Sequence, residues 1–252
     1  MVRSIKSNGA LAFTLIGGPI VPTLDSEYCR IYTRDNKVYT GTVLSNSPAA
    51  HVFKDAKDRM RDAENMEIRI DEEIYKKEDA ERLGICAGDF ICIDTKTQIT
   101  ESGFIKSRFL DDKASAAVLF GVLKAWKDNG IKPENNVDFL FSVYEEVGHG
   151  MASLPHGLDE LLAVDMGCIG DDLSCTEYDV SICAKDSSGP YDYDMTSKLK
   201  TAAEDNGLSY AVDIYPYYGS DASAALRGGN DIRTALIGPG VQASHGMERT
   251  HY

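Results

Sequence analysis

The sequence predicts an α/β protein, with a layered domain built on a mostly parallel mixed sheet and a small all-β region before it. Two observations lead to this fold class. From about residue 8 to about residue 100, short strand-like pieces are separated by turn residues, which is typical of a small β-barrel or sandwich. From residue 105 onward, long helical patterns alternate with apolar strands, and such alternation favours helices packed against a mostly parallel sheet.

Strand-like segments dominate the first region. The expected strands cover residues 11–16, 28–33, 38–44, 66–70 and 89–93. One short helix is expected over 77–83, because Gly84 follows it as a stop signal.

The second region alternates between the two periodicities. A long helix is expected over 112–129, where apolar residues recur at helical spacing and Gly130 follows. The other expected helices cover 195–205 and 221–227, and the expected strands cover 137–144, 161–165, 179–183, 210–214 and 232–237.

Composition excludes several classes of partner. The 252 residues include 40 acidic and 26 basic side chains, and the formal net charge of −14 makes phosphate backbones and anionic membrane surfaces poor partners. An apolar content of 43% is that of an ordinary globular protein, and no apolar run approaches the roughly 18 residues of a membrane helix. We therefore expect neither nucleic-acid nor membrane binding.

The six cysteines are scattered and form no Cys-x-x-Cys pair. Most lie in apolar or strand-like contexts, as Cys86 and Cys92 do, so we expect buried free thiols rather than a disulfide framework. The first residues also lack the apolar core of a signal peptide. These observations favour a cytoplasmic protein.

Two adjacent carboxylates, Glu145 and Glu146, follow the apolar run 137–143. We interpret the run as a buried strand, so one of the two acids should point inward at the carboxyl end of a sheet, where α/β sheets usually bind ligands. Asp165 ends a second apolar strand and should reach the same edge. Buried carboxylates are costly without a cation, and this arrangement therefore predicts a metal site.

Other residues could complete this site. Asp111 and Asp112 precede the long helix, although an acidic N-cap would explain them equally well. A histidine in the loop around His245 is by default solvated, but the carboxylates call for an imidazole partner. His149, just beyond the glutamates, and His251, near the chain end, are rival candidates.

Five motifs occur in the order and spacing of one known family. They are Leu110-Asp111-Asp112-Lys113, Tyr144-Glu145-Glu146-Val147-Gly148, Val164-Asp165-Met166-Gly167, Gly219-Ser220-Asp221-Ala222 and Ser244-His245-Gly246-Met247-Glu248. The combination covers most of the chain and resembles the glutamyl aminopeptidase, or tetrahedral aminopeptidase, family of dinuclear metallopeptidases. The resemblance implies a metallopeptidase α/β domain over 105–252 with its first strand at 1–7 and an inserted β-barrel over 8–104. It also implies a cytoplasmic homo-oligomer, from dimers to dodecamers, that acts on peptides.

The resemblance implies a role for each motif residue. Asp111 resembles the aspartate that bridges two metal ions, with a cis peptide bond to Asp112, and Glu145 resembles the general base. Glu146 and His245 resemble ligands of one metal. The other metal would be held by Asp165, and the further supporting candidates are Asp112, Asp221, His149 and His251.

The family also has a histidine in a His-x-Asp motif, and the first six residues here resemble those that directly follow it. The chain also stops at Tyr252, where the family continues. We therefore expect a fragment with one well-formed site from Asp111, Glu146 and His245 and a weaker second site, and hence reduced activity.

In the complete site, two divalent ions would activate a water while Glu145 transfers its proton to the leaving amine. Zinc or cobalt suits the mixed carboxylate and imidazole ligands, with manganese as a further candidate. Two alternatives stay open, namely a non-catalytic assembly or binding protein of the same fold and, less favoured, a glycosidase that uses a carboxylate pair. The single tryptophan, Trp126, offers little surface for stacking on sugars.

Overall fold

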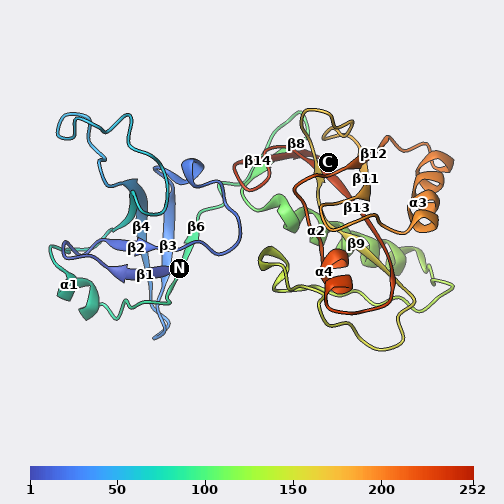
Figure 1. Cartoon of the computed structure of the whole chain (residues 1–252), viewed down its shortest axis with the longest axis horizontal. Helices are drawn as coiled ribbons and strands as arrows, with labels where there is room; N and C mark the ends of the chain where they lie inside the picture. Colours follow the sequence, from blue (N-terminus) through green and yellow to red (C-terminus); the bar gives the residue numbers. More distant parts are fainter. The chain divides into compact units, whose positions relative to one another are not determined.

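A computed structural model describes residues 1–252 and divides them into two compact units, Met1–Thr95 and Lys96–Tyr252 (Figure 1). Each unit has hydrophobic core clusters of its own. No helix in the chain is both long enough and apolar enough to cross a bilayer.

The first unit is a six-stranded antiparallel sheet in the order β1-β2-β5-β4-β3-β6. Its elements are β1 (Val2–Ile5), β2 (Leu11–Phe13), β3 (Tyr28–Tyr32), β4 (Val38–Ser45), β5 (Met66–Ile70), α1 (Lys77–Arg82), β6 (Phe90–Ile93) and the 3₁₀ turn η1 (Val21–Leu24). Val2 N donates to Asp89 O (2.8 Å) and Gly88 N donates to Val2 O (2.9 Å), so the two edge strands meet. The sheet therefore closes on itself around a core that includes Leu11, Ile31 and Met66, as expected of a barrel.

The boundaries of the two units differ from those expected. Strand β1 is hydrogen-bonded within the sheet of the first unit instead of joining the second, because it pairs with β2 in an antiparallel register. The first unit ends at Thr95, since β7 (Gln98–Ile99) and β8 (Phe104–Ser107) form a sheet with β14 (Glu248–His251) in the second unit.

The second unit has the mostly parallel mixed sheet that the sequence predicts. Its strands are β9 (Glu160–Val164), β10 (Gly167–Cys168), β11 (Val180–Lys185), β12 (Tyr210–Ile214) and β13 (Arg233–Val241). Strands β9 and β10 pair in parallel with β13, β11 pairs in parallel with β12, and only β11 and β13 are antiparallel. The central β13 lies between β11 on one side and β9 and β10 on the other, so one sheet carries residues from distant parts of the chain.

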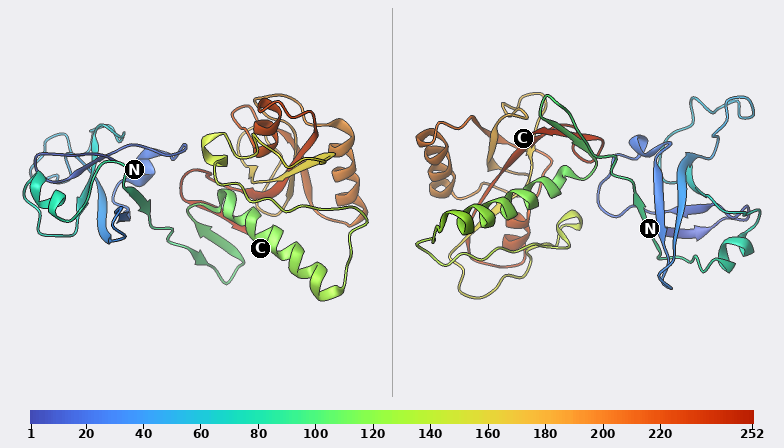
Figure 2. Two further views of the ribbon diagram at one scale, coloured as in Figure 1. Left: turned by 90° about the horizontal axis from the view of Figure 1, so that it is seen from below. Right: turned by 180° about the vertical axis from the view of Figure 1, so that it is seen from behind.

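Helices cover both faces of this sheet. They are α2 (Leu110–Asn129), α3 (Tyr193–Asp205) and α4 (Asp221–Arg227), close to the ranges expected. The views from the front and from behind place α4 and α2 on opposite faces (Figure 2). On the α4 side, Ala222 packs with Ala163 and Leu236, and on the α2 side, Leu110 packs with Met166 and Val241.

The predicted strand over 137–144 is wrong. These residues pair with no strand, and Val137 and Val143 are exposed. The aromatic side chains of the run pack on helix α2 instead, Phe139 against Trp126 and Phe141 against Phe120. An apolar run of this length signals a packed segment but does not specify whether its partner is a strand or a helix.

Candidate metal and catalytic site

Asp165 directly follows β9 and is buried, with 5% of its surface exposed. Its Oδ1 accepts a hydrogen bond from Met166 N (2.6 Å), and its carbonyl accepts one from Ser115 Oγ (2.8 Å) on α2. The Tyr218 hydroxyl donates to Met166 O (3.0 Å) and also hydrogen-bonds the Asp165 carboxyl group. These contacts hold the carboxylate at the carboxyl end of β9, the edge that the sequence predicts.

Asp111 and Asp112 lie in the first turn of α2 and are not helical, with ψ angles of 106° and 24°. The peptide bond between them is cis, as the family resemblance implies. The N-cap position is Phe109, whose side chain makes no cap hydrogen bond, and the two aspartates lie at a kink directly after it. Asp112 hydrogen-bonds the Ser115 side chain, while its Oδ1 is buried without a partner.

The two adjacent glutamates form a short 3₁₀ turn, η2 (Glu145–Val147), rather than the end of a strand. Glu145 is half-buried and Glu146 retains more contact with solvent. Asp221 is the first residue of α4, after Ser220, whose side chain caps the helix by accepting from Ser223 N. Asp221 lies near Glu145, because its charge contributes to the raised pKa of that glutamate.

Glycine allows the close approach of these segments. A Cβ atom at Gly150, just after the glutamates, would lie 1.6 Å from Asp221 Oδ1. Asp221 is also held by hydrogen bonds to Ser142 and to the backbone of Met151, while its Oδ1 is buried without a partner. The loop 142–151 is thus packed directly against the start of α4.

His245 Nε2 lies 3.4 Å from Asp111 Oδ2, so the structure brings these two predicted ligands together. The other two candidate histidines lie elsewhere. His149 is exposed in the turn after η2, and the ring of His251 packs between Phe104 and Tyr178, with Nε2 3.0 Å from the carbonyl of Ser102. The contacts of His251 involve no carboxylate of the cluster.

Burial, and after it the repulsion between neighbouring acids, raises the pKa values of the carboxyl groups in this cluster. Burial, followed by the charges of Asp221 and Glu146, raises the pKa of Glu145 to about 8. Burial and then Asp111 raise the pKa of Asp112 to about 7. The same two causes raise the pKa of Glu146, although His245 and Lys113 oppose them.

Asp165 has the deepest position in the cluster. Burial, followed by the charges of Asp111 and Asp112, raises its pKa well above the ordinary value. Asp221 also has a raised pKa, again caused first by burial. Because several acids disfavour each other's ionised forms here, a bound cation would relieve a repulsion that Lys113 and His245 offset only in part at Glu146.

The cluster fits a divalent metal by its donor set and by two orphaned oxygens. Asp112 Oδ1 and Asp221 Oδ1 are buried without a hydrogen-bond partner, and buried carboxylate oxygens without partners are costly. Carboxylates with one imidazole are borderline ligands of the kind that bind zinc. The side chains are not closed into a coordination shell, since no three His, Cys, Asp or Glu residues have the geometry of a metal site.

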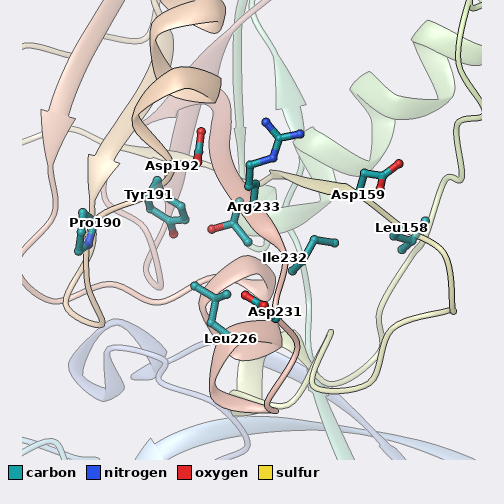
Figure 3. A pocket seen from close by; sticks show the side chains of 10 residues that line it. Leu158, Asp159, Pro190, Tyr191, Asp192, Leu226, Asp231, Ile232 and Arg233 are labelled. Atoms are coloured by element: carbon teal, nitrogen blue, oxygen red, sulfur yellow. The ribbon is translucent and has the colours of Figure 1, made fainter.

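A hollow in the surface of the second unit lies away from this cluster. It is lined by Tyr191, Asp192, Leu226 and the residues before β9 and at the start of β13 (Figure 3). Asp159 and Arg233 mark the amino ends of these parallel strands, whereas Asp165 follows the carboxyl end of β9. This hollow is therefore distinct from the carboxylate cluster.

Sequence reasoning missed Glu248 and Tyr218. Glu248 appeared only inside a motif and carries no signal of its own, yet its buried carboxylate contacts the backbone of both Asp111 and His245. Tyr218 lies in a loop with other tyrosines, and only the folded chain brings it to Asp165.

The second unit is thus a layered α/β domain with a cluster of carboxylates after the carboxyl end of β9. The chain belongs to the M42 glutamyl aminopeptidase family, whose model matches residues 1–252. It is accordingly a peptide-bond hydrolase of the aminopeptidase class.

Relatives and solved structures agree with this family. The Bacillus subtilis protein YhfE, named provisionally as an aminopeptidase, is 50% identical to this chain. The match covers the whole of this chain and 73% of YhfE. The TET aminopeptidase of a marine sediment archaeon of the Thaumarchaeota matches 99% of this chain and 72% of its own with a TM-score of 0.87 at 20% identity. The Pyrococcus horikoshii TET1 peptidase matches 99% and 74% with a TM-score of 0.83 at 23% identity. These two structures share the fold.

Proposed function

We propose that the second unit is a metal-dependent aminopeptidase that releases N-terminal residues from peptides. The observation that supports this most directly is the carboxylate cluster beside His245. Its residues come from the start of α2, the end of β9 and two loops, and the chain belongs to an aminopeptidase family. The proposed metal ligands are Asp111, Glu146, Asp165 and His245. A bound divalent ion would supply an activated water and polarise the scissile carbonyl.

Glu145 is the proposed general base. Its pKa is raised to about 8 by burial and by the neighbouring acids, and a cation in the cluster would lower it toward neutrality. A carboxyl group that titrates near neutral pH can accept a proton from water and return it to the leaving amine. Asp221, whose Oδ1 is buried without a partner, could receive the free amine of the substrate.

The test is hydrolysis of aminoacyl-anilides in the presence of zinc or cobalt. Glu145→Gln should lose at least about a hundredfold in kcat while it still binds metal, because it removes the proton acceptor without removing a ligand. Wild-type levels of activity in Glu145→Gln would reject this role.

N-acetylated peptides separate aminopeptidase action from other peptide hydrolysis. If the free amine is recognised, acetylation should abolish cleavage of an otherwise identical peptide. Equal cleavage of both forms would contradict the exopeptidase assignment.

The same assay decides between the enzyme and the alternatives. A non-catalytic assembly protein of this fold would bind metal but release no amino acid. The carboxylate-pair glycosidase has little support, since Trp126 packs edge to face against Phe139 and is not presented for stacking on a sugar.

We further propose that the chain forms a homo-oligomer in the cytoplasm. The Pyrococcus horikoshii TET1 peptidase can assemble into a tetrahedron or a large octahedral shell. The six cysteines here form no disulfide, although Cys86 and Cys92 are exposed and the expectation that they are buried is wrong. The mass of the particle in solution, from light scattering during size-exclusion chromatography, tests the assembly, and a monomer would contradict it.

A further inference from the structure

Glu248 is a buried carboxylate that is placed between two of the proposed metal ligands. It is the first residue of β14, and only 2% of its surface is exposed. Its Oε2 accepts a hydrogen bond from Asp111 N (3.0 Å), and its Oε1 accepts one from His245 N (2.9 Å). One side chain therefore binds the backbone of both residues, which lie 134 positions apart in the chain (245 − 111).

Neighbouring contacts fix this carboxylate in place. In the pairing of β14 with β8, Glu248 lies opposite Ser107, so the segment that leads into α2 runs beside the His245 turn. Arg108, in the segment that leads into α2, donates from Nη1 to the carbonyl oxygen of Gly246 (3.3 Å) in the His245 turn. The turn that precedes Glu248 is thus tied to the segment that leads into α2 through both Glu248 and Arg108.

The backbone that Glu248 holds is unusual at both ends. His245 has a φ of +64°, in the left-handed region that few non-glycine residues adopt, and Asp111 is non-helical inside the first turn of α2. Two backbone N–H groups that donate to one buried carboxylate can stabilise this pair of conformations. With the backbones held, His245 Nε2 and Asp111 Oδ2 stand 3.4 Å apart.

We propose that Glu248 is a positioning residue, which sets the distance between Asp111 and His245 so that both side chains reach one divalent ion. This inference rests on the proposed metal-dependent function. Glu248 need not touch the metal itself, because each of its oxygens already accepts a backbone N–H group. Partners that orient metal ligands in this way are typically worth about ten- to a hundredfold in metal affinity.

Two substitutions separate the geometry of this contact from its charge. Glu248→Gln keeps the size but turns one acceptor into an amide N–H₂ group, which faces a backbone N–H donor. Glu248→Asp keeps the charge but is one methylene shorter and cannot reach both N–H groups. The matched control is Glu177→Gln. Glu177 Oε1 lies 2.6 Å from Nε of Arg249, which follows Glu248 in β14, and this ion pair involves neither Asp111 nor His245.

The experiment titrates each protein with cobalt and follows the visible absorption of the bound ion together with the affinity from calorimetry. We expect both Glu248 variants to lose about ten- to a hundredfold in affinity with an altered cobalt spectrum, and Glu177→Gln to keep the wild-type values. Circular dichroism establishes the temperature at which each metal-free variant is folded, and the titrations are carried out there.

The outcomes distinguish this inference from the function it rests on. If the wild-type protein binds no cobalt, the proposed metal-dependent function fails. If the wild-type protein binds cobalt and hydrolyses peptides, but the Glu248 variants retain the same affinity and spectrum, only the positioning role is overturned. Loss of the fold in both variants would also overturn it, because Glu248 would then act in stability rather than in ligand placement.

Discussion

Raising the pH should destabilise the metal-free second unit. In the folded chain the pKa of Glu145 is raised to about 8 and that of Asp112 to about 7, first by burial and then by neighbouring acids. In the unfolded chain these groups titrate near 4.5 and 3.8. Between these values the folded state binds more protons than the unfolded state, so the free energy of unfolding falls as the pH rises.

The size of this effect follows from the number of protons involved. Each additional proton in the folded state changes the free energy of unfolding by about 1.4 kcal/mol per pH unit. Between about pH 6 and pH 7, Glu145 stays protonated and Asp112 reaches half-titration, so these two groups together contribute at most about 2 kcal/mol. Because both side chains keep some contact with water, we expect a loss of about 1 to 2 kcal/mol.

Urea unfolding in the presence of a chelator measures this loss. Trp126 is the only tryptophan and lies on α2, so its fluorescence reports the unit that contains the cluster. The double variant Asp112→Asn with Glu145→Gln is neutral at both positions and should remove the part of the pH dependence that these two groups contribute, while Asp165, whose pKa is also raised by burial, keeps its own part. A free energy of unfolding that stays constant or rises between pH 6 and pH 7 would refute the reasoning.

Three further predictions concern the metal, the packing of the cluster and the core. Chelation should abolish aminoacyl-anilide hydrolysis, and added zinc or cobalt should restore it; activity that survives exhaustive chelation would count against the metal. Gly150→Ala should reduce kcat by up to about a hundredfold, because its Cβ would lie 1.6 Å from Asp221 Oδ1, whereas Gly121→Ala, with no atom within 4 Å, should have little effect on the same assay. Leu236→Ala, at a position only 1% exposed, should lower the urea-derived stability of the second unit by about 2 to 5 kcal/mol, and a loss under about 1 kcal/mol would mean that the core there is loosely packed.

Elements with strong local signals could be predicted from the sequence. Helix α4 begins and ends where expected, since Ser220 caps it and its alanines face the sheet. The positions of Asp111 and Asp165 could also be inferred, because one precedes a long helix and the other ends an apolar strand. For His245, the sequence offers only its place in a family motif. Its proximity to Asp111 is seen in the folded chain.

Features that depend on distant pairing could not be predicted. The run 137–144 has the apolar pattern of a buried strand, yet its rings pack on Trp126 and Phe120 of α2. The contacts of Glu248 exist only because β14 pairs with β8, and a lone glutamate in a strand gives no sign of such a partner. Tertiary structure, rather than local propensity, decides both cases.

The central claim is that side chains from separate segments of the second unit bind a divalent ion. Anomalous diffraction from crystals grown with zinc, with data collected on both sides of the zinc absorption edge, tests this most directly. We expect a strong peak within bonding distance of Asp111, Glu146 and His245, with Asp165 on the far side of Asp111. Zinc bound at other residues, with no peak among these four, would contradict the account.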